Sequence, residues 1–261
     1  NTFIMVGEGG KIWRTNGNGS SWNNVTSPTS EDLSDVTFGN NTFVAVAYDG
    51  AIVWSTDNGS SWKLRKVFSD ELRGVTFGNN TFVAVMEGDS SNKGYIVRST
   101  NNGSTWNYAT SPTFTTIVNH FEDVAFGNNT FVAVGYRGNI VKSTNNGSSW
   151  DNVSLTGFDG TGSDTKWFKG VTFGNNTFVA VERYGNIVRS TNNGSSWDNV
   201  TYDATSLASN RFTDVTFGNN TFVAFTEGGI LRSTDNGSSW DNVTRELPAD
   251  DWYTWKVGFR E

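Results

Sequence analysis

The chain repeats one segment along its whole length. Each copy contains an Asn-Thr-Phe triplet, a run of small and β-branched residues, and a later turn that ends in Trp. The phenylalanine of the triplet recurs at Phe3, Phe43, Phe82, Phe131, Phe178 and Phe222, so successive copies are 40, 39, 49, 47 and 44 residues apart. This is the length of one four-stranded propeller blade. Units of this kind cannot bury their own apolar faces and must pack against one another.

The composition agrees with an all-β chain. Helix formers are scarce, whereas Gly, Asn, Ser, Thr, Val, Phe and Trp dominate, as expected of strands joined by tight turns. A ring of repeats closes as one domain. The sequence therefore predicts a six-bladed β-propeller of four-stranded antiparallel blades, in a single domain over residues 1–261.

Charge and apolar content exclude several functions. A net charge of −7 and a pI near 4.8 argue against nucleic-acid binding, which needs a basic face. No apolar run approaches the roughly 20 residues that cross a membrane, so membrane insertion is not expected. Cysteine is absent, and disulfides contribute nothing. The chain begins at Asn1 without Met or a signal peptide, and we expect a mature product or an excised domain.

The copy at 169–201 illustrates one blade. Alternating apolar and polar residues predict strands A, B, C and D at 170–174, 177–182, 186–190 and 197–201. Asn175-Asn176 is expected to form the A–B hairpin turn, because Asn tolerates positive φ better than most residues. Bulky side chains on both faces of strand B indicate a sheet with a neighbour on each side.

The turn before each Trp carries a repeated motif. It reads Ser55-Thr56-Asp57-Asn58-Gly59-Ser60-Ser61-Trp62, and again Ser-x-Asp-x-Gly-x-Ser-Trp at 233–240. Three copies place Asn at the Asp position, and the first places Gly there: Asn101, Asn145, Asn192 and Gly17. The motif resembles the Asp-box of the bacterial neuraminidase repeat, found in sialidase-like and sortilin-like β-propellers. The resemblance covers the whole chain and implies the fold. It implies little about function, because sialidases, sortilin-type receptors, photosystem assembly factors and xyloglucanases all carry Asp-boxes.

The motif has a local physical purpose. An Asx side chain accepts hydrogen bonds from its own turn, Gly supplies positive φ, and Trp is a large apolar anchor. The resemblance implies that the box tryptophans pack between sheets, namely Trp22, Trp62, Trp106, Trp150, Trp197 and Trp240. A recurring Asp could also indicate calcium, but its exchange with Asn and its loss at Gly17 favour a turn brace. We expect no metal and no cofactor.

The ends of the chain match each other. The chain starts at a B strand, and residues 255–259 match the A strand at 34–38. Five residues lead from Phe38 to Phe43, and five lead from Phe259 to Phe3 if the termini are joined. We therefore expect the C-terminal strand to pair with the N-terminal strand and close the ring, which removes exposed sheet edges.

Variable loops lie at one end of the blades. B–C loops and D–A connections share a face, and a rigid scaffold with variable loops is the usual way to present a binding site. Planar aromatics beside charged groups suit a sugar or a peptide. The candidate ligand-binding residues are Tyr48, Asp49, Tyr136, Arg137, Arg183, Tyr184, Trp167 and Trp252. Of these, Tyr136, Arg137, Arg183 and Tyr184 are expected to form one aromatic–cationic cluster for an anionic or hydroxylated ligand.

Other residues near this face have plainer interpretations. His120, the single histidine, is interpreted as a loop residue. The cations before the boxes, Arg98, Lys142, Arg189 and Arg232, indicate an exposed flank of the C strands. The aromatics before the A strands are expected to cap the hydrophobic layer, namely Phe121, Phe168, Phe212 and Trp255.

The sialidase resemblance does not extend to catalysis. That family needs an arginine triad, a Tyr–Glu pair and an acid/base residue, and it usually carries Arg-Ile-Pro near its start, which is absent here. Blades of this length leave no long insert for a deep pocket. Acidic B–C loop residues such as Glu8, Glu87 and Glu227 leave glycoside hydrolysis open. Solvated turns explain them as well, and we expect no enzyme activity.

Two non-enzymatic classes remain. Richness in Asn, Ser, Thr and Gly, low Lys and absent Cys favour a glycan-binding or adhesin-like module, extracellular or at the cell surface, that binds a glycan or cell-surface ligand. The alternative is a protein-assembly scaffold with a protein partner, for which a single-sign charged patch would be expected. The isolated domain is expected to be a monomer.

Overall fold

The computed structural model describes residues 2–17, 19–66, 68–88, 94–110, 120–153, 155, 166–203, 205, 207 and 209–243. Within them, regular structure is β strand apart from one short 3-10 helix, η1 (Glu8–Gly10). Residues 244–261, which carry Trp252, Trp255 and the expected closing strand, lie outside the described residues. Closure of the ring therefore stays a prediction.

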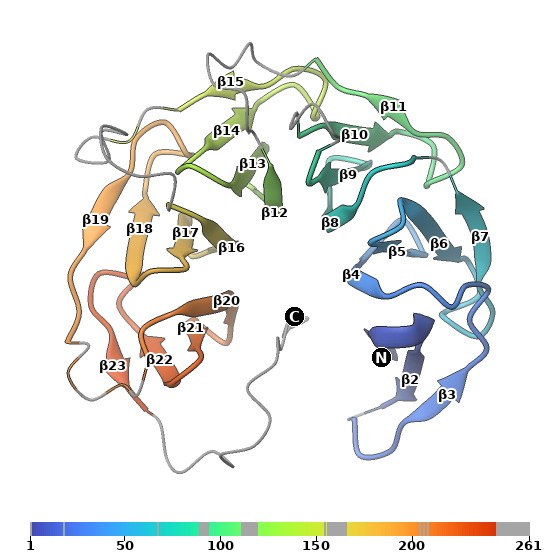
Figure 1. The fold of residues 1–261 in the computed structure, drawn as a ribbon, viewed down its shortest axis with the longest axis horizontal. Coiled ribbons are helices and arrows are strands. Elements are labelled where there is room, and N and C mark those ends of the chain that lie inside the picture. The colour runs from blue at the N-terminus through green and yellow to red at the C-terminus, as the bar shows by residue number, and fades with distance from the viewer. Residues whose placement is uncertain are drawn as a thin grey trace. The chain divides into compact units, whose positions relative to one another are not determined.

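Six antiparallel sheets follow one another along the chain (Figure 1). The first three contain β1 (Thr2–Val6), β2 (Ile12–Asn16) and β3 (Asn23–Val25); β4 (Leu33–Gly39), β5 (Thr42–Ala47), β6 (Ala51–Ser55) and β7 (Lys63–Lys66); and β8 (Leu72–Gly78), β9 (Thr81–Met86), β10 (Ile96–Ser99) and β11 (Asn107–Tyr108). The last three contain β12 (Phe121–Gly127), β13 (Thr130–Gly135), β14 (Ile140–Ser143) and β15 (Asp151–Asn152); β16 (Phe168–Gly174), β17 (Thr177–Glu182), β18 (Asn186–Ser190) and β19 (Asp198–Val200); and β20 (Phe212–Gly218), β21 (Thr221–Thr226), β22 (Gly229–Ser233) and β23 (Asp241–Asn242). In each sheet the strands pair in chain order, and the described part of the first sheet lacks an A strand, as predicted. The sheets are consistent with a six-bladed propeller.

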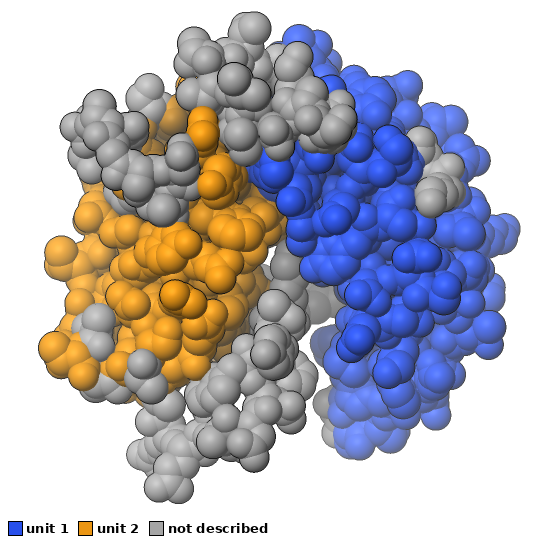
Figure 2. Space-filling view, in the orientation of Figure 1, with its two compact units in different colours: residues 1–121, 145–150 blue, residues 122–144, 151–261 orange. Residues whose placement is uncertain are grey.

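The chain divides into two compact units (Figure 2). One comprises Asn1–Phe121 with Asn145–Trp150, and the other comprises Glu122–Thr144 with Asp151–Glu261. In the described ranges no helix is long and apolar enough to cross a membrane.

The A–B turns have the predicted backbone. Asn175 and Asn176 have φ of 46° and 59°, so both central residues are left-handed. This is the geometry of a type I′ hairpin, which matches the twist of its flanking strands. The predicted B and C strands of this blade coincide with β17 and β18.

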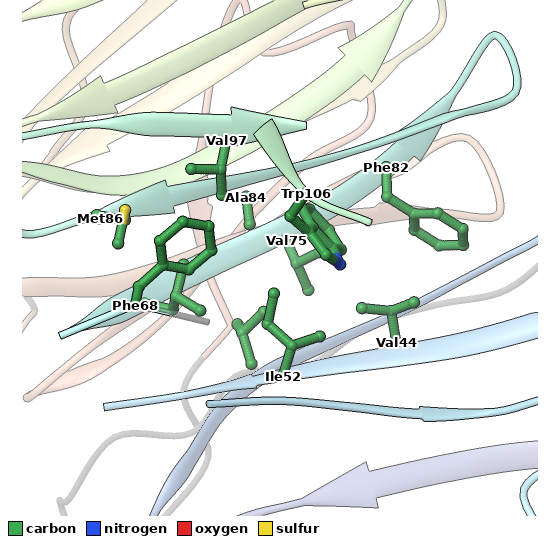
Figure 3. Packing of buried hydrophobic residues seen from close by; sticks show 11 residues of the cluster. Val44, Ile52, Phe68, Val75, Phe82, Ala84, Met86, Val97 and Trp106 are labelled. Atoms are coloured by element: carbon green, nitrogen blue, oxygen red, sulfur yellow. The ribbon is translucent and has the colours of Figure 1, made fainter. Parts of the chain in front are cut away.

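Buried side chains of neighbouring sheets interdigitate. In the first unit, Trp106 and Phe82 of the third sheet share a cluster with Val44 and Ile52 of the second (Figure 3). Within a sheet, the Phe82 and Trp106 rings lie 6.5 Å apart. Box tryptophans that join such clusters across sheets, as predicted, are Trp62, Trp106, Trp197 and Trp240.

The prediction for Trp22 is wrong. Its side chain is 38% exposed, whereas the other five box tryptophans are buried. In four of those five the indole Nε1 donates to the carbonyl of the box glycine, as Trp62 does to Gly59 at 3.2 Å. The first copy has Gly17 at the Asx position, so it lacks the side chain that braces the turn in the other copies.

The Asx residue of each intact box is the turn brace that the sequence predicts. Asp57 Oδ1 accepts hydrogen bonds from Ser61 N at 2.9 Å and from Ser55 Oγ at 2.7 Å. Asn192 Oδ1 accepts one from Ser196 N at 2.9 Å in the same way. An amide and a carboxylate are interchangeable here because Oδ1 accepts the hydrogen bonds of the turn in both. The last hydroxyl of the box adapts, since Ser61 Oγ donates to Asp57 Oδ2 whereas Ser196 Oγ accepts from Asn192 Nδ2.

The two aspartate boxes differ from the asparagine boxes in their response to acid. Hydrogen bonds, first of all from the Ser61 hydroxyl, lower the pKa of Asp57 from 3.8 to about 2. Burial raises the pKa of Asp235, but hydrogen bonds led by that of Ser239 outweigh it and the pKa is again about 2. A carboxyl with a depressed folded pKa stabilises the protein above its unfolded pKa and loses that contribution as the pH falls through the folded value.

We expect the double variant Asp57→Asn, Asp235→Asn to fold, because Asn192 occupies the same position. The melting temperature of the parent should fall more steeply between pH 4 and pH 2 than that of the variant. Thermal melts at half-unit pH steps measure this difference. Parallel curves for the two proteins over this range would contradict the assignment.

Carboxylates on the A strands link neighbouring sheets within each unit. Asp35 Oδ2 accepts a hydrogen bond from Val75 N, and Asp123 Oδ2 accepts one from Val171 N, both at 2.8 Å. In both cases the acceptor lies on one A strand and the donor on the next. The sequence analysis did not predict these bonds. They stabilise the position of each A strand relative to the next.

Candidate ligand-binding site

Tyr136 follows β13 in a short, well-bonded loop of the second unit. Gly135 N donates to Asn139 O at 3.0 Å, which closes the loop. Gly138 N donates to Lys166 O, also at 3.0 Å, and ties the loop to the segment that precedes β16. The loop of one sheet is thus held against the start of the A strand in the next.

Trp167 lies immediately before β16 and is held through its backbone. Its carbonyl accepts a hydrogen bond from Arg183 N at 2.8 Å, and its N–H donates to Glu182 Oε1 at 3.0 Å. The other oxygen of Glu182 accepts a hydrogen bond from Asn186 Nδ2 at 2.8 Å. Glu182 is 1% exposed, so this buried carboxylate positions Trp167 and has no free oxygen for chemistry.

Two cations and a tyrosine surround the Trp167 indole. The Arg183 guanidinium carbon lies 4.9 Å from the ring centroid, and the Lys169 ammonium nitrogen lies 4.3 Å from it. Both distances fall in the range of cation–π attraction. The Tyr136 ring packs edge-on, with centroids 5.8 Å apart and an interplanar angle of 83°. We call these four residues, Tyr136, Trp167, Lys169 and Arg183, the Trp167 cluster.

Lys169 reaches the cluster through a β-bulge. The register of β16 against β17 shifts between Phe168 and Gly170, so Lys169 is the extra residue of the bulged strand. Bulges re-aim side chains in this way and are frequent beside functional sites. Its ammonium also forms an ion pair with Glu122 at 2.9 Å, and the Glu122 side chain is only 5% exposed. The sequence analysis missed both residues.

The predicted four-residue cluster forms only in part. Tyr136 and Arg183 meet through Trp167, which the sequence analysis named as a candidate but did not include in this cluster. Arg137 is half-buried with a φ of 58°. Tyr184 lies in the turn after β17 with 46% of its side chain exposed. These two residues flank the cluster along the chain.

A hydrogen bond from Tyr202 holds the loop that carries Arg183 and Tyr184. Tyr202 donates its hydroxyl proton to Gly185 O at 3.0 Å. Burial, and secondarily the negative charge of Glu182, raise the pKa of Tyr202 to about 12. The hydroxyl therefore remains protonated, and a donor, at neutral pH.

Tyr48 and Asp49 belong to the first unit and lie apart from the Trp167 cluster in the chain, and ligand binding by them stays a prediction. Tyr48 is 40% exposed and lies over Arg73, with 4.7 Å between the guanidinium carbon and the ring centroid. Asp49 Oδ1 accepts a hydrogen bond from Ala51 N at 2.9 Å and so braces its own turn. Arg73 also forms ion pairs with Glu71 and Glu87.

His120 and the capping aromatics follow the plainer interpretation. His120 Nδ1 lies 3.3 Å from Glu87 Oε1, next to the ion pairs of Arg73. The side chains of Phe121, Phe168 and Phe212 are buried, as predicted. In the described part of the chain no three His, Cys, Asp or Glu side chains are grouped so that they could hold a metal ion.

The Trp167 cluster suits an anionic ligand better than a neutral one. The cations approach the indole, so a sugar ring that stacked on this indole would compete with them. An anionic group would instead meet the guanidinium and ammonium donors of Arg183 and Lys169. Tyr136, Trp167 and the exposed Tyr184 supply aromatic surface beside these donors.

Comparisons with known proteins show the fold. No protein-family model and no curated protein matches the sequence. Among solved structures, YCF48 bound to a D1 peptide is 18% identical, with a TM-score of 0.63 over 92% of this chain and 76% of that one. The chain has a β-propeller fold.

Two glycoside hydrolases of the GH74 group share that fold. An ancestral GH74 enzyme is 19% identical, with a TM-score of 0.68 over 92% of this chain. The GH74 xyloglucanase from Xanthomonas campestris is 13% identical, with a TM-score of 0.65 over 89% of this chain. The match spans 36% and 43% of those longer chains. At these identities the likeness extends to the propeller and not to function.

Proposed function

We propose that the protein is a non-enzymatic binding module that recognises an acidic glycan at the Trp167 cluster. The observation that carries this proposal is the convergence of Lys169 and Arg183 on one indole, 4.3 and 4.9 Å from its centroid. Cations that are oriented by an aromatic ring and a buried carboxylate need little reordering when a ligand arrives, which lowers the cost of binding. The setting of the protein is then extracellular or at the cell surface.

A neutral ligand would use this arrangement less well. Carboxylate or sulfate oxygens form charge-assisted hydrogen bonds with Arg, and these are roughly twice as strong as neutral ones. Sugar hydroxyls would be secondary acceptors and donors at the polar tips of Tyr136 and Tyr184. Lys169 is already paired with Glu122, so an anion would be selected chiefly by the Arg183 guanidinium.

The test is a glycan array with acidic and neutral saccharides, followed by affinity measurements on variants. We expect acidic saccharides to bind and the double variant Arg137→Asn, Arg183→Ala to lose about tenfold or more in affinity. Asn is used at 137 because it tolerates the φ of 58° better than Ala does. Lys169 is left intact, since its removal would leave Glu122 buried without its cation.

The control is Arg65→Ala, which removes an exposed cation from β7 that lies over Trp54. Affinity should be unchanged in this control, and the melting temperatures of all three proteins should agree within about 2 °C. If the folded double variant binds as the parent does, the Trp167 cluster is not the binding site.

A second candidate is a peptide-binding scaffold. The structure of YCF48 with a D1 peptide shares this fold over 92% of the chain, so a propeller of this kind can bind a peptide. A pull-down from lysate of the source organism, run beside the array, separates the two functions. Protein partners without glycan hits would favour the scaffold. Glycan hits without protein partners would favour the glycan-binding module.

A glycoside hydrolase is the third and least favoured class. Glu182 has both oxygens engaged and Glu122 is paired with Lys169, so these two buried carboxylates serve the structure of the site. Hydrolysis needs a carboxyl that can exchange a proton with the substrate. Release of reducing sugar from any array-positive glycan would contradict the proposal of a non-enzymatic module.

A further inference from the structure

Cations of the C strands reach across to the box turn of the next sheet. Arg14 Nε donates to Asn58 O at 2.8 Å, and Lys142 Nζ donates to Ser195 Oγ at 2.7 Å. Arg189 donates to Asn236 O at 3.2 Å and also contacts Ser238. These cations link neighbouring sheets, so the exposed flank inferred from the sequence is also an inter-sheet contact.

Arg98, at the equivalent place in β10, departs from this pattern. Its backbone pairs with β9 and β11, but its side chain makes no hydrogen bond and no ion pair among the described residues, although its Nε is buried. Leaving a buried donor without a partner destabilises the protein, and more so when the group is charged. An arginine in this state calls for an explanation, of which a missing ligand is one.

The adjacent box turn is held by other means. Thr110, just after β11, donates its N–H to Ser148 O at 3.0 Å and accepts a hydrogen bond from Trp150 N at 3.1 Å. A parallel bridge also joins Thr110 to Ser149. All of these residues belong to the first unit. The backbone after β11 makes the inter-sheet contact here, whereas in other sheets a cation of the C strand makes it. The Arg98 side chain takes no part in this contact.

A polar cavity of about 210 Å³ opens beside Arg98. Its lining is Arg98, Thr100, Asn107, Tyr108, Thr110 and Ser148. The side chains of these lining residues carry one guanidinium, one amide and four hydroxyls. Such donors suit a ligand that is rich in oxygen atoms.

Tyr108 distinguishes this place from the equivalent places in other sheets. It pairs with Val97, and the residues in the same register of the other five sheets are Asn24, Leu64, Asn152, Asn199 and Asn242. The Tyr108 ring is 57% exposed, yet Phe68 and Tyr95 each hold it edgewise with centroids 5.3 Å away. A rigid, exposed ring beside a polar cavity offers a stacking surface with little loss of side-chain entropy.

We propose that this cavity is a second binding site, for a saccharide residue that bears a carboxylate. The carboxylate pairs with the Arg98 guanidinium, which is the one group in the lining that carries a charge. Sugar hydroxyls bond to Asn107 and to the Thr and Ser hydroxyls, and the sugar ring lies against Tyr108. This site is separate from the Trp167 cluster, and neither proposal depends on the other.

The test is a titration of the protein with D-glucuronate, with D-glucose as the neutral probe. Two-dimensional ¹H–¹⁵N spectra report the Arg98 Nε–H signal and the Asn107 side-chain amide. We expect saturable shifts of both signals with D-glucuronate and at least tenfold weaker binding of D-glucose. The Arg189 Nε–H signal should stay unshifted, because that guanidinium already has partners.

Two variants decide the assignment. Arg98→Ala should fold as the parent does, since the Arg98 side chain has no hydrogen-bond or ion-pair partner in the described part of the chain. It should weaken D-glucuronate binding about tenfold or more at the Asn107 amide. Tyr108→Asn introduces the residue found in four other sheets and should weaken binding several-fold. It should lower the melting temperature modestly, because the edge-on contacts of the ring with Phe68 and Tyr95 are lost. Arg183→Ala should leave the Arg98 shifts intact, whatever the array shows for the Trp167 cluster. Equal shifts with D-glucose, shifts that do not saturate, or full binding by Arg98→Ala would each overturn the proposal.

Discussion

Trp197→Ala is expected to lower the free energy of unfolding by about 3–5 kcal/mol. The Trp197 side chain is 3% exposed and belongs to a cluster that combines the fourth and fifth sheets, with Val132 and Ile140 from one and Phe178 from the other. Its ring lies 6.4 Å from that of Phe178. Truncation removes the transfer free energy of most of an indole and leaves a cavity that β strands cannot close. Chemical denaturation with fluorescence of the remaining tryptophans measures the change.

The control for this prediction is Trp22→Ala. It is the same substitution at the same place in the repeat, but Trp22 is 38% exposed, and we expect a loss of about 1 kcal/mol or less. Asn192→Gly should cost less than Trp197→Ala, because it removes the hydrogen bonds of an exposed turn and leaves the buried indole in place. Similar losses for Asn192→Gly and Trp197→Ala would show that the brace, and not the packing, stabilises the sheet.

The repeat accounts for what could be predicted from the sequence. The limits of β17 and β18, the left-handed Asn175-Asn176 turn and the brace formed by Asp57 all depend on residues close together in the chain. Local geometry of this kind is specified by turn chemistry and strand alternation. Each of these features could therefore be predicted from the sequence of a single repeat.

Contacts between copies could not be predicted in the same way. Lys169 meets Glu122 across 47 residues, and Asp123 meets Val171 across 48, because of the stagger between adjacent A strands. The bulge that re-aims Lys169 also leaves no signal in the hydrophobic pattern, since Gly170 alone does not distinguish a bulge from a regular strand. The sequence analysis therefore named the loop residues of the Trp167 cluster as candidates but missed Lys169, which lies in a strand.

One signal for the missed residue was present. Arg73 occupies the same position in β8 as Lys169 does in β16, and β8 has a register shift at that position too. Arg73 lies over Tyr48, and Lys169 lies over Trp167. A cation at the second position of an A strand, when an aromatic residue lies near it on the loop face, predicts a cation–aromatic contact in this fold.

Gly174→Ala is expected to cost about 3 kcal/mol or more, through a clash with the next sheet. A Cβ at Gly174 would lie 2.1 Å from Cγ of Phe217 and 2.2–2.3 Å from both of its Cδ atoms, so the Phe217 ring lies with its face over the glycine. Phe217 cannot simply move away, because its ring packs at 4.6 Å against Phe222, which is fully buried. Gly174 does not have positive φ, so backbone strain contributes nothing and the whole effect is steric.

The matched control is Gly7→Ala, where a new Cβ has nothing within 4 Å and the backbone is extended, so we expect a change within about 0.5 kcal/mol. The double variant Gly174→Ala, Phe217→Leu tests the cause. If the methyl group clashes with the ring, a smaller and more flexible side chain relieves it, and the two substitutions together should cost less than the sum of their separate losses. Strict additivity, or a Gly174→Ala variant that unfolds with the parent, would show that the sheets do not approach each other this closely. Because Gly39 and Gly127 face Phe77 and Phe173 in the same way, the result would apply to each of these sheet–sheet contacts.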